Sequence, residues 1–217
     1  MNRLPKGFLI AVEGLDGVGK TTLCEKLAKK IEQNEYPVIQ TRQPGGTALG
    51  KEIRHILHES LERPTPLAEY FLLAADRAQH MSTLILPALN DHKIVISDRM
   101  GDSSLAYQGY GRGIDLDFIR YVNNKAMQGH MPDLTIYVRL DFSEALNRLK
   151  TRGTKATAFE KESHAFFKRV AEGFETLYAT PIPQLLVLEG TQTPDILADQ
   201  AYQKVLLLLS GEPCAKK

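Results

Sequence analysis

Residues 8–22 read FLIAVEGLDGVGKTT, an apolar run followed by a glycine-rich turn and the start of a helical pattern. Within this stretch, Gly14, Gly19, Lys20 and Thr21 have the spacing G-x-x-x-x-G-K-[ST]. Glycines allow several backbone N–H groups to point at one anion, and the N-terminus of the following helix adds the positive end of its dipole. We therefore predict a strand, a loop that holds the phosphates of a nucleoside triphosphate, and a helix, rather than a plain glycine-rich turn.

Three side chains of this loop have predicted roles of their own. Lys20 would supply a full charge to the transferred phosphate, and the Thr21 hydroxyl would contact Mg²⁺. A triphosphate would repel Asp16, so we expect this carboxylate to point outward and accept a hydrogen bond from a second substrate; a surface turn aspartate is the alternative. The residues predicted to bind ATP are Gly14, Leu15, Asp16, Gly17, Val18, Gly19, Lys20, Thr21 and Thr22.

The remaining sequence alternates short apolar runs with longer periodic segments, which is typical of a parallel sheet with helices on both faces. The predicted strands are residues 8–14, 37–42, 93–99, 133–140 and 184–190. A first helix covers residues 19–33, others begin near Ala48, Pro66, Leu116 and Ser143, and a last one spans 194–209. We expect an α/β fold of three layers, α/β/α, with a five-stranded parallel sheet, in a single domain of residues 1–217.

Composition excludes several other classes of protein. The 217 residues include 27 basic and 26 acidic side chains, a formal net charge of +1, which gives no overall attraction to nucleic acid or to anionic membranes. The sequence has two cysteines, Cys24 and Cys214, too few for a disulfide framework or a metal cluster. Its first residues, MNRLPKG, are too few and too polar to predict a signal peptide, and it has no run of ~18 apolar residues. We expect a cytoplasmic protein without nucleic-acid or membrane partners.

A second ligand is expected at the carboxyl ends of the strands, where open α/β sheets bind their ligands. Asp98 and Arg99 are neighbours at the end of the third predicted strand, so their side chains should leave on opposite sides. Asp98 would face Mg²⁺ or its waters, while Arg99 would bind an acceptor phosphate bidentately. A pair of surface charges is the alternative interpretation.

Further candidates for the second ligand have polar side chains on predicted helices. Ser104, Tyr107 and Gln108 share one helical face by their spacing, and they suit hydrogen bonding to a base or sugar, although a capped helix start has a similar composition. Arg77 lies four residues after Leu73 on an otherwise apolar helix. It either snorkels to solvent or binds a polar base edge.

Five motifs together resemble a known family. EGLDGVGKTT (13–22), RQPGGT (42–47), DR..DSSLAYQG.GRGID (98–115), PDLTIY (132–137), and TRG with FEKES (151–163) are similar to bacterial-type thymidylate kinase, in the P-loop nucleoside monophosphate kinase superfamily. The resemblance spans nearly the whole chain and implies a P-loop NTPase fold that transfers the γ-phosphoryl group of ATP to dTMP, giving dTDP, with Mg²⁺ and usually as a homodimer.

The resemblance also implies roles for individual residues. Asp16 would contact the sugar or phosphate region of the acceptor, Arg99 its phosphate, Arg77 the thymine edge and Tyr107 the deoxyribose face. Ser104 and Gln108 would contact the base. The implied dTMP-binding residues are Asp16, Pro44, Leu73, Arg77, Arg99, Ser104, Tyr107 and Gln108, and the implied catalytic residues are Lys20, Arg99, Arg152 and Asp16.

The sequence departs from this family at several positions. Gln43 stands where Glu is usual, Met100 where an aromatic residue is usual, and Arg139 where an acidic residue is common. Leu73 occupies the place of a phenylalanine that stacks on thymine, and losing that ring should forfeit about 1 kcal/mol. Leu73 therefore suggests loosened base choice.

The family places an arginine against the moving phosphoryl group, either from the loop or from a lid. The loop position before Gly19 is Val18, so we assign this role to a lid at about residues 150–162. Arg152 is the expected principal cation, assisted by Lys155, with Arg148 behind them; solvated surface charges are the alternative. The D-R-F-E sequence usual in the family is Thr157–Ala158–Phe159–Glu160 here, without its arginine.

Two other functions fit parts of the sequence. One is a nucleoside monophosphate kinase of relaxed base specificity, suggested by Leu73. The other is a nucleotide-binding protein with weakened catalysis, suggested by Ala158 and Gln43. The presence of Lys20 and Arg99 argues against the second, since mere binding does not require both.

Overall fold

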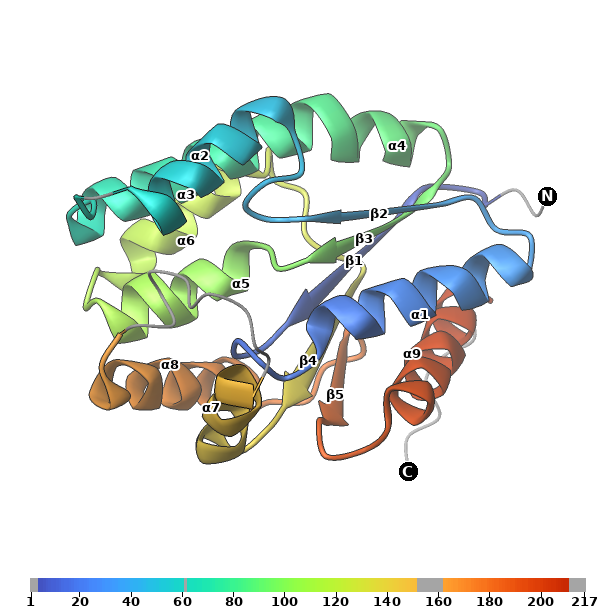
Figure 1. The fold of residues 1–217 in the computed structure, drawn as a ribbon. Coiled ribbons are helices and arrows are strands. Elements are labelled where there is room, and N and C mark those ends of the chain that lie inside the picture. Colours follow the sequence, from blue (N-terminus) through green and yellow to red (C-terminus); the bar gives the residue numbers. More distant parts are fainter. Residues whose placement is uncertain (1–3, 61, 152–161, 211–217) are drawn as a thin grey trace.

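A computed structural model of the protein describes residues 4–60, 62–151 and 162–210. Its sheet has the strand order β2-β3-β1-β4-β5, and every neighbouring pair runs parallel. Helices cover both faces of this sheet (Figure 1). The predicted α/β class and five-stranded parallel sheet are therefore confirmed. The strands are β1 (Phe8–Glu13), β2 (Val38–Arg42), β3 (Ile94–Asp98), β4 (Leu134–Arg139) and β5 (Leu185–Glu189).

The helices begin close to the predicted positions, and the one expected at Ser143 begins one residue earlier. Within the described ranges, no helix combines the length and apolar character needed to cross a bilayer. The helices are α1 (Lys20–Gln33), α2 (Ala48–Glu59), α3 (Pro66–His80), α4 (Leu86–Asn90), α5 (Gly101–Ser104), α6 (Leu116–Ala126), α7 (Phe142–Thr151), α8 (His164–Leu177) and α9 (Pro194–Leu209), with π-helical segments η1 (Met81–Ile85) and η2 (Leu105–Gly111).

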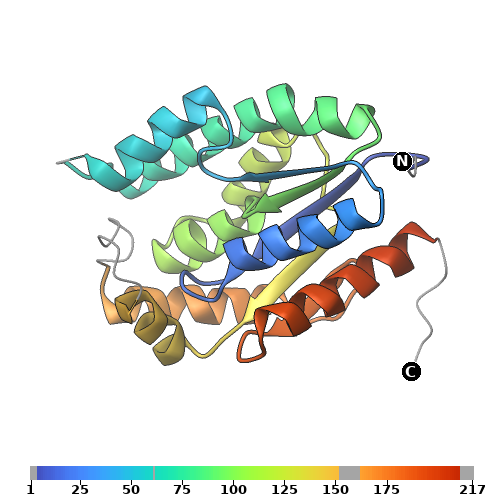
Figure 2. The same cartoon turned by 45° about the vertical axis from the view of Figure 1, so that its right-hand side comes forward.

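The central strand β1 is buried on both faces, as its continuous apolar sequence predicts. Ile10 and Val12 belong to the core cluster that includes Leu27 of α1, whereas Leu9 and Ala11 belong to the cluster that includes η1. The first cluster extends to α9, which lies beside α1 (Figure 2). Burial on both sides fixes β1 and, with it, the loop that follows.

The helix predicted from Pro66 continues without a break through η1 and α4 to Asn90. Pro87 lies at the start of α4. Because proline lacks an N–H and its ring crowds the carbonyl four residues earlier, the wider π-turn before it relieves the clash. This helical run brings Arg77 against the loops that follow β2 and β3, where it contacts Gln43 and Met100.

Strand register brings the functional loops together. Val12 of β1 pairs with Asp98 of β3 and with Ile136 of β4, so the carboxyl ends of the three central strands meet at one edge. The chain turns from one side of β1 to the other between β3 and β4. Such a switch point is where open α/β sheets form ligand sites.

Candidate active site

The loop between β1 and α1 has the backbone that its glycines predict. Gly14, Gly17 and Gly19 all have positive φ, and a side chain on Gly17 would meet the Ala145 carbonyl oxygen at 2.6 Å. Lys20, the first residue of α1, is buried, and its Nζ donates to the Leu15 carbonyl oxygen at 2.6 Å. Burial lowers the pKa of this ammonium to about 8, and the charge of Arg99 adds to the effect. The Lys20 ammonium therefore lies over the loop, where a phosphate oxygen would replace the Leu15 carbonyl oxygen as its hydrogen-bond acceptor.

Two oxygen ligands meet beside the loop. The Thr21 hydroxyl donates to Asp98 Oδ2 at 2.6 Å, which joins the second residue of α1 to the last residue of β3. Hydroxyl and carboxylate oxygens are hard donors that suit Mg²⁺, which is commonly held by one or two protein groups together with phosphates and waters. No group of three or more metal-binding side chains occurs in the described ranges. The pair fits a metal site completed by a nucleotide.

Arg99 spans the space between the loop and the helices that follow β3. It adopts a positive φ of 71°, and its Nη1 donates to the Gly14 carbonyl oxygen at 2.9 Å and to Ser103 Oγ at 2.8 Å. Its Nη2 donates to Asp16 Oδ1 at 2.7 Å and to the Tyr107 hydroxyl oxygen at 3.2 Å. Arg99 therefore holds the loop and η2 in one polar cluster.

Asp16 faces this cluster, on the side where the acceptor was expected. Besides Arg99, its carboxylate accepts from the Tyr107 hydroxyl at 3.2 Å. Burial raises the pKa of the Asp16 carboxyl, but the charges of Arg99 and Lys20 outweigh it and hold the pKa well below its usual range. Asp16 is therefore ionised at neutral pH.

Arg77 lies buried among neutral oxygens and does not snorkel to solvent. Its Nε donates to Gln43 Oε1 at 3.1 Å and its Nη1 to Asn123 Oδ1 at 2.6 Å. Its Nη2 donates to Ser104 Oγ at 2.9 Å and to the Met100 carbonyl oxygen at 3.2 Å. These four hydrogen bonds hold the guanidinium in place, but each goes to a neutral oxygen and none of them neutralises the positive charge.

Gln43 connects Arg77 to a buried histidine. Because Gln43 Oε1 accepts from Arg77, its Nε2 faces His80 Nδ1 at 3.0 Å, which must then accept. The ring proton is thereby assigned to Nε2, 2.7 Å from Thr41 Oγ1. Burial, with the charge of Arg77, lowers the pKa of His80 to about 4. The ring is neutral at pH 7.

The phosphate loop, Asp98, Arg99, Arg77 and Gln43 line one cleft of about 500 Å³, whereas His80 is not part of its lining. It is lined by most of the predicted site residues, namely Asp16, Gly17, Gly19, Lys20, Thr21, Thr22, Pro44, Leu73, Arg77, Asp98, Arg99, Ser104, Tyr107 and Gln108. Gly14, Leu15 and Val18 are not part of the lining, and the last two are packed in the core. The cleft has a cationic end at the loop and a wall around Arg77 with mixed polar and apolar groups.

Comparisons with known proteins identify the family. The family model for thymidylate kinase matches residues 12–200. The chain is 42% identical over 193 residues to the thymidylate kinase of Pelotomaculum thermopropionicum, covering 88% of this chain and 89% of the relative. It is 47% identical over 178 residues to that of a Synechococcus species, covering 79% and 84%. The crystal structure of thymidylate kinase from Ehrlichia chaffeensis superposes with a TM-score of 0.74 at 30% identity, covering 93% of this chain and 99% of that one.

The chain belongs to the thymidylate kinase family. The resemblance stated from the five motifs is thus confirmed, and with it the class of enzyme, a nucleoside monophosphate kinase. The P-loop fold is confirmed by the same likeness to a solved thymidylate kinase.

Only some of the lid residues expected of a thymidylate kinase lie in the described ranges. Arg152, Lys155 and Ala158 lie outside the described residues. Arg148, in α7, donates to the Gly190 carbonyl oxygen at 3.0 Å and to Glu144 at 2.6 Å, and it does not line the cleft. The expectation that it stands behind the lid cations stays a prediction.

Sequence reasoning overlooked several groups of the cleft. Arg54, His58 and Asp76 line it, and Asp76 Oδ1 accepts from Gly45 N at 3.1 Å while its buried Oδ2 has no hydrogen-bond partner within the described ranges. On amphipathic helices such residues look like a solvated face. Glu13, at the end of β1, does not line the cleft but accepts from Met100 N at 2.7 Å and so braces the turn between Arg99 and α5; its one signal was a carboxylate ending an apolar strand.

One departure from the family pattern has a structural explanation away from the cleft. Arg139 forms ion pairs with Glu175 at 3.2 Å and Glu189 at 3.3 Å, and its guanidinium lies over the Tyr137 ring. It joins β4, β5 and α8 at the surface. Arg139 is thus paired with acidic neighbours on adjacent elements.

Proposed function

We propose that this protein transfers the γ-phosphoryl group of ATP to dTMP, giving dTDP and ADP. The observation that carries the proposal is the single cleft that joins the phosphate loop to the wall around Arg77, with Arg99 at the junction. Membership of the thymidylate kinase family supports the same donor and acceptor. ATP would bind at the loop and dTMP at the wall.

The chain's own groups would act by charge and position. Lys20 would exchange the Leu15 carbonyl for the β- and γ-phosphates, and Arg99 would hold the acceptor phosphate in line with the γ-phosphorus. An acceptor oxygen forms the new P–O bond as the bond to the ADP oxygen breaks. Because the acceptor phosphate is largely a dianion at pH 7, it is itself the nucleophile and needs no strong general base.

We infer that Mg²⁺ accompanies the donor and that Thr21 and Asp98 hold it, directly or through water. Their 2.6 Å contact supports this assignment, since the two oxygens already converge beside the loop. When bound, Mg²⁺ neutralises charge on the β- and γ-phosphates. Asp16 pairs with Arg99 instead, where it would contact the acceptor rather than the metal.

Arg152 is proposed as the main lid cation, assisted by Lys155, because the loop supplies no arginine. Arg152→Ala should lower kcat at least about tenfold through lost stabilisation of the transferring phosphoryl group, with little change in KM for dTMP. Lys150→Ala serves as a nearby control that removes one positive charge. Unchanged turnover in Arg152→Ala would show that the charge comes from elsewhere.

A kinase of relaxed base specificity is the second candidate, favoured by Leu73 in the cleft lining. An aliphatic side chain packs against any base face, whereas an aromatic ring adds stacking energy. The decisive assay is ADP release from ATP and Mg²⁺ with dTMP, dUMP, dGMP or AMP as acceptor. Release with dTMP alone supports the first proposal, release with several acceptors supports the second, and release with none contradicts both.

We also propose that the protein is a homodimer. Leu67, Phe71, Phe118 and Tyr121 form an exposed α3–α6 apolar patch, in which Phe71 and Tyr121 are 49% and 63% exposed. The Phe71 and Phe118 rings are 6.3 Å apart, and both helices lie on the same side of the molecule (Figure 1). Contiguous exposed apolar side chains commonly mark an interface. A cytoplasmic location stays a prediction from the sequence.

A further inference from the structure

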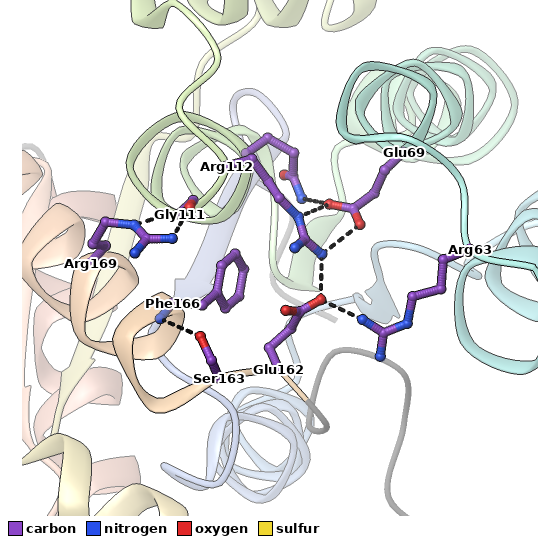
Figure 3. Close-up of polar contacts among 9 residues, drawn as sticks. Arg63, Glu69, Gly111, Arg112, Glu162, Ser163, Phe166 and Arg169 are labelled. Atoms are coloured by element: carbon purple, nitrogen blue, oxygen red, sulfur yellow. Dashed lines mark hydrogen bonds and ion pairs between the residues drawn. The ribbon is translucent and has the colours of Figure 1, made fainter.

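Arg112, directly after η2, joins three elements through one guanidinium (Figure 3). Its Nε and Nη2 donate to Glu69 Oε1 and Oε2 of α3, at 3.2 and 2.9 Å. Its Nη2 also donates to Glu162 Oε1, two residues before α8, at 2.8 Å. The contact with Glu69 uses both carboxylate oxygens, the geometry that makes arginine–carboxylate pairs strong and directional.

This cluster is shielded from water and braced by packing. The three charged side chains are at most 17% exposed. The guanidinium lies 4.5 Å from the centre of the Phe166 ring, and Arg169 of α8 donates twice to the Gly111 carbonyl oxygen, at 3.2 and 2.7 Å. The end of η2 and the start of α8 are thereby held to one another, with Arg112 between them.

The cluster reaches the cleft through Gln108. This side chain lines the cleft, and its Nε2 donates to Glu69 Oε1 at 2.9 Å, the same oxygen that accepts from Arg112. An ionised carboxylate only accepts, so the contact assigns the amide with its nitrogen toward Glu69. The carbonyl oxygen of Gln108 is then the group left for a ligand.

We propose that Glu69 and Arg112 are positioning residues that hold the Gln108 amide in one orientation, so that its carbonyl oxygen selects an acceptor base with a ring N–H. The inference rests on the proposed function. Thymine carries a proton on N3, whereas N3 of cytosine is an acceptor that would oppose the Gln108 oxygen. Arg112 matters because its bidentate contact holds the Glu69 carboxylate in one orientation. Without it, Glu69 can rotate, and the amide can flip to donate toward the cleft.

The test compares kcat/KM for dTMP and for dCMP in the full-length protein and in Arg112→Gln. Loss of one oriented hydrogen bond should lower the dTMP-to-dCMP ratio roughly tenfold, mainly through a higher KM for dTMP, while KM for ATP stays within about twofold. Arg112→Lys keeps the positive charge but cannot bind Glu69 bidentately, so its dTMP-to-dCMP ratio should lie between those of the wild type and Arg112→Gln. Arg120→Gln, which removes an exposed arginine paired with Asp117 on α6, is the matched control.

Glu69→Gln provides a second route should Arg112→Gln fold poorly, because it leaves Arg112 with Glu162 while allowing the Gln108 amide to flip. It should lower the same ratio. A ratio unchanged within about twofold in Arg112→Gln and Glu69→Gln, even with a lower melting temperature, would overturn the positioning role and leave the proposed function intact. A wild-type protein that phosphorylates no dTMP would instead overturn the proposed function, and this inference with it.

Discussion

Lys20 shows how a single residue makes nucleotide binding depend on pH. Its buried ammonium has a pKa of about 8, so the charge that ATP requires is lost as pH rises above 8. The dissociation constant for ATP should rise by up to about tenfold per pH unit there. Isothermal titration calorimetry between pH 7 and 9.5 measures it, and the same titration should show proton uptake on binding. In Lys20→Met the slope should vanish; a slope that persists would point to another group.

Gln43 and His80 give a second prediction at the scale of one residue. The neutral amide leaves His80 with a pKa of about 4. Gln43→Glu would place a carboxylate 3.0 Å from Nδ1 and should raise that pKa to above about 5, because a neighbouring negative charge favours the imidazolium. NMR titration of the histidine rings measures the change, with exposed His130 as the internal reference. A pKa that stays near 4 would mean that Arg77 neutralises the new carboxylate completely.

Among single residues, the sequence predicted that those near the ends of strands would lie together, and most of them line one cleft. The loop residues, Asp98 and Arg99 follow strands, and the ends of parallel strands necessarily meet. Asp76 was missed because a polar residue on a mainly apolar helix has the same pattern whether it faces solvent or a cleft. Only the packing of α3 against the β2 loop distinguishes the two.

At the scale of elements, η2 and α8 approach closely through two glycines. A side chain on Gly111 would meet Phe166 at 2.7 Å, and one on Gly173 would meet Tyr110 at 2.7 Å. Gly173→Ala gains helix propensity of at most about 1 kcal/mol, but overpacking should cost about 1–3 kcal/mol. We therefore expect net destabilisation in urea unfolding, with exposed Glu172→Ala on the same helix near neutral. A more stable Gly173→Ala would show that Tyr110 moves aside freely.

The elements were predictable where periodicity is strong. Strands β1 and β5 are short apolar runs that end at a glutamate, and α1 carries Leu23, Leu27 and Ile31 on its buried face as expected. The π-helical segments η1 and η2 were not predicted, because a wider turn leaves no signature in hydrophobic spacing. Ser104 at the end of α5 and Tyr107 and Gln108 in η2 line one cleft, yet they contact different partners.

At the scale of the whole molecule, the α3–α6 apolar patch predicts self-association. Phe71→Asp should convert a dimer to a monomer, since a buried unpaired charge at an interface costs several kcal/mol. Size-exclusion chromatography with light scattering reads the mass directly. Ile196→Asp, which changes an exposed apolar residue of α9 outside the patch, should leave the mass unchanged. A wild-type protein of monomer mass would contradict the proposed interface.

Because Arg99 is paired with Asp16, a ligand at the predicted acceptor end of the cleft must compete with this ion pair. The Arg99 guanidinium pairs with the protein's own Asp16 carboxylate at 2.7 Å. An incoming group must attract it more strongly than one carboxylate does, which a phosphate dianion can do. Thymidine, which lacks the phosphate, offers nothing to draw Arg99 away. We therefore predict that the acceptor is selected by charge before its base makes contact, so nucleosides should compete poorly with nucleotides.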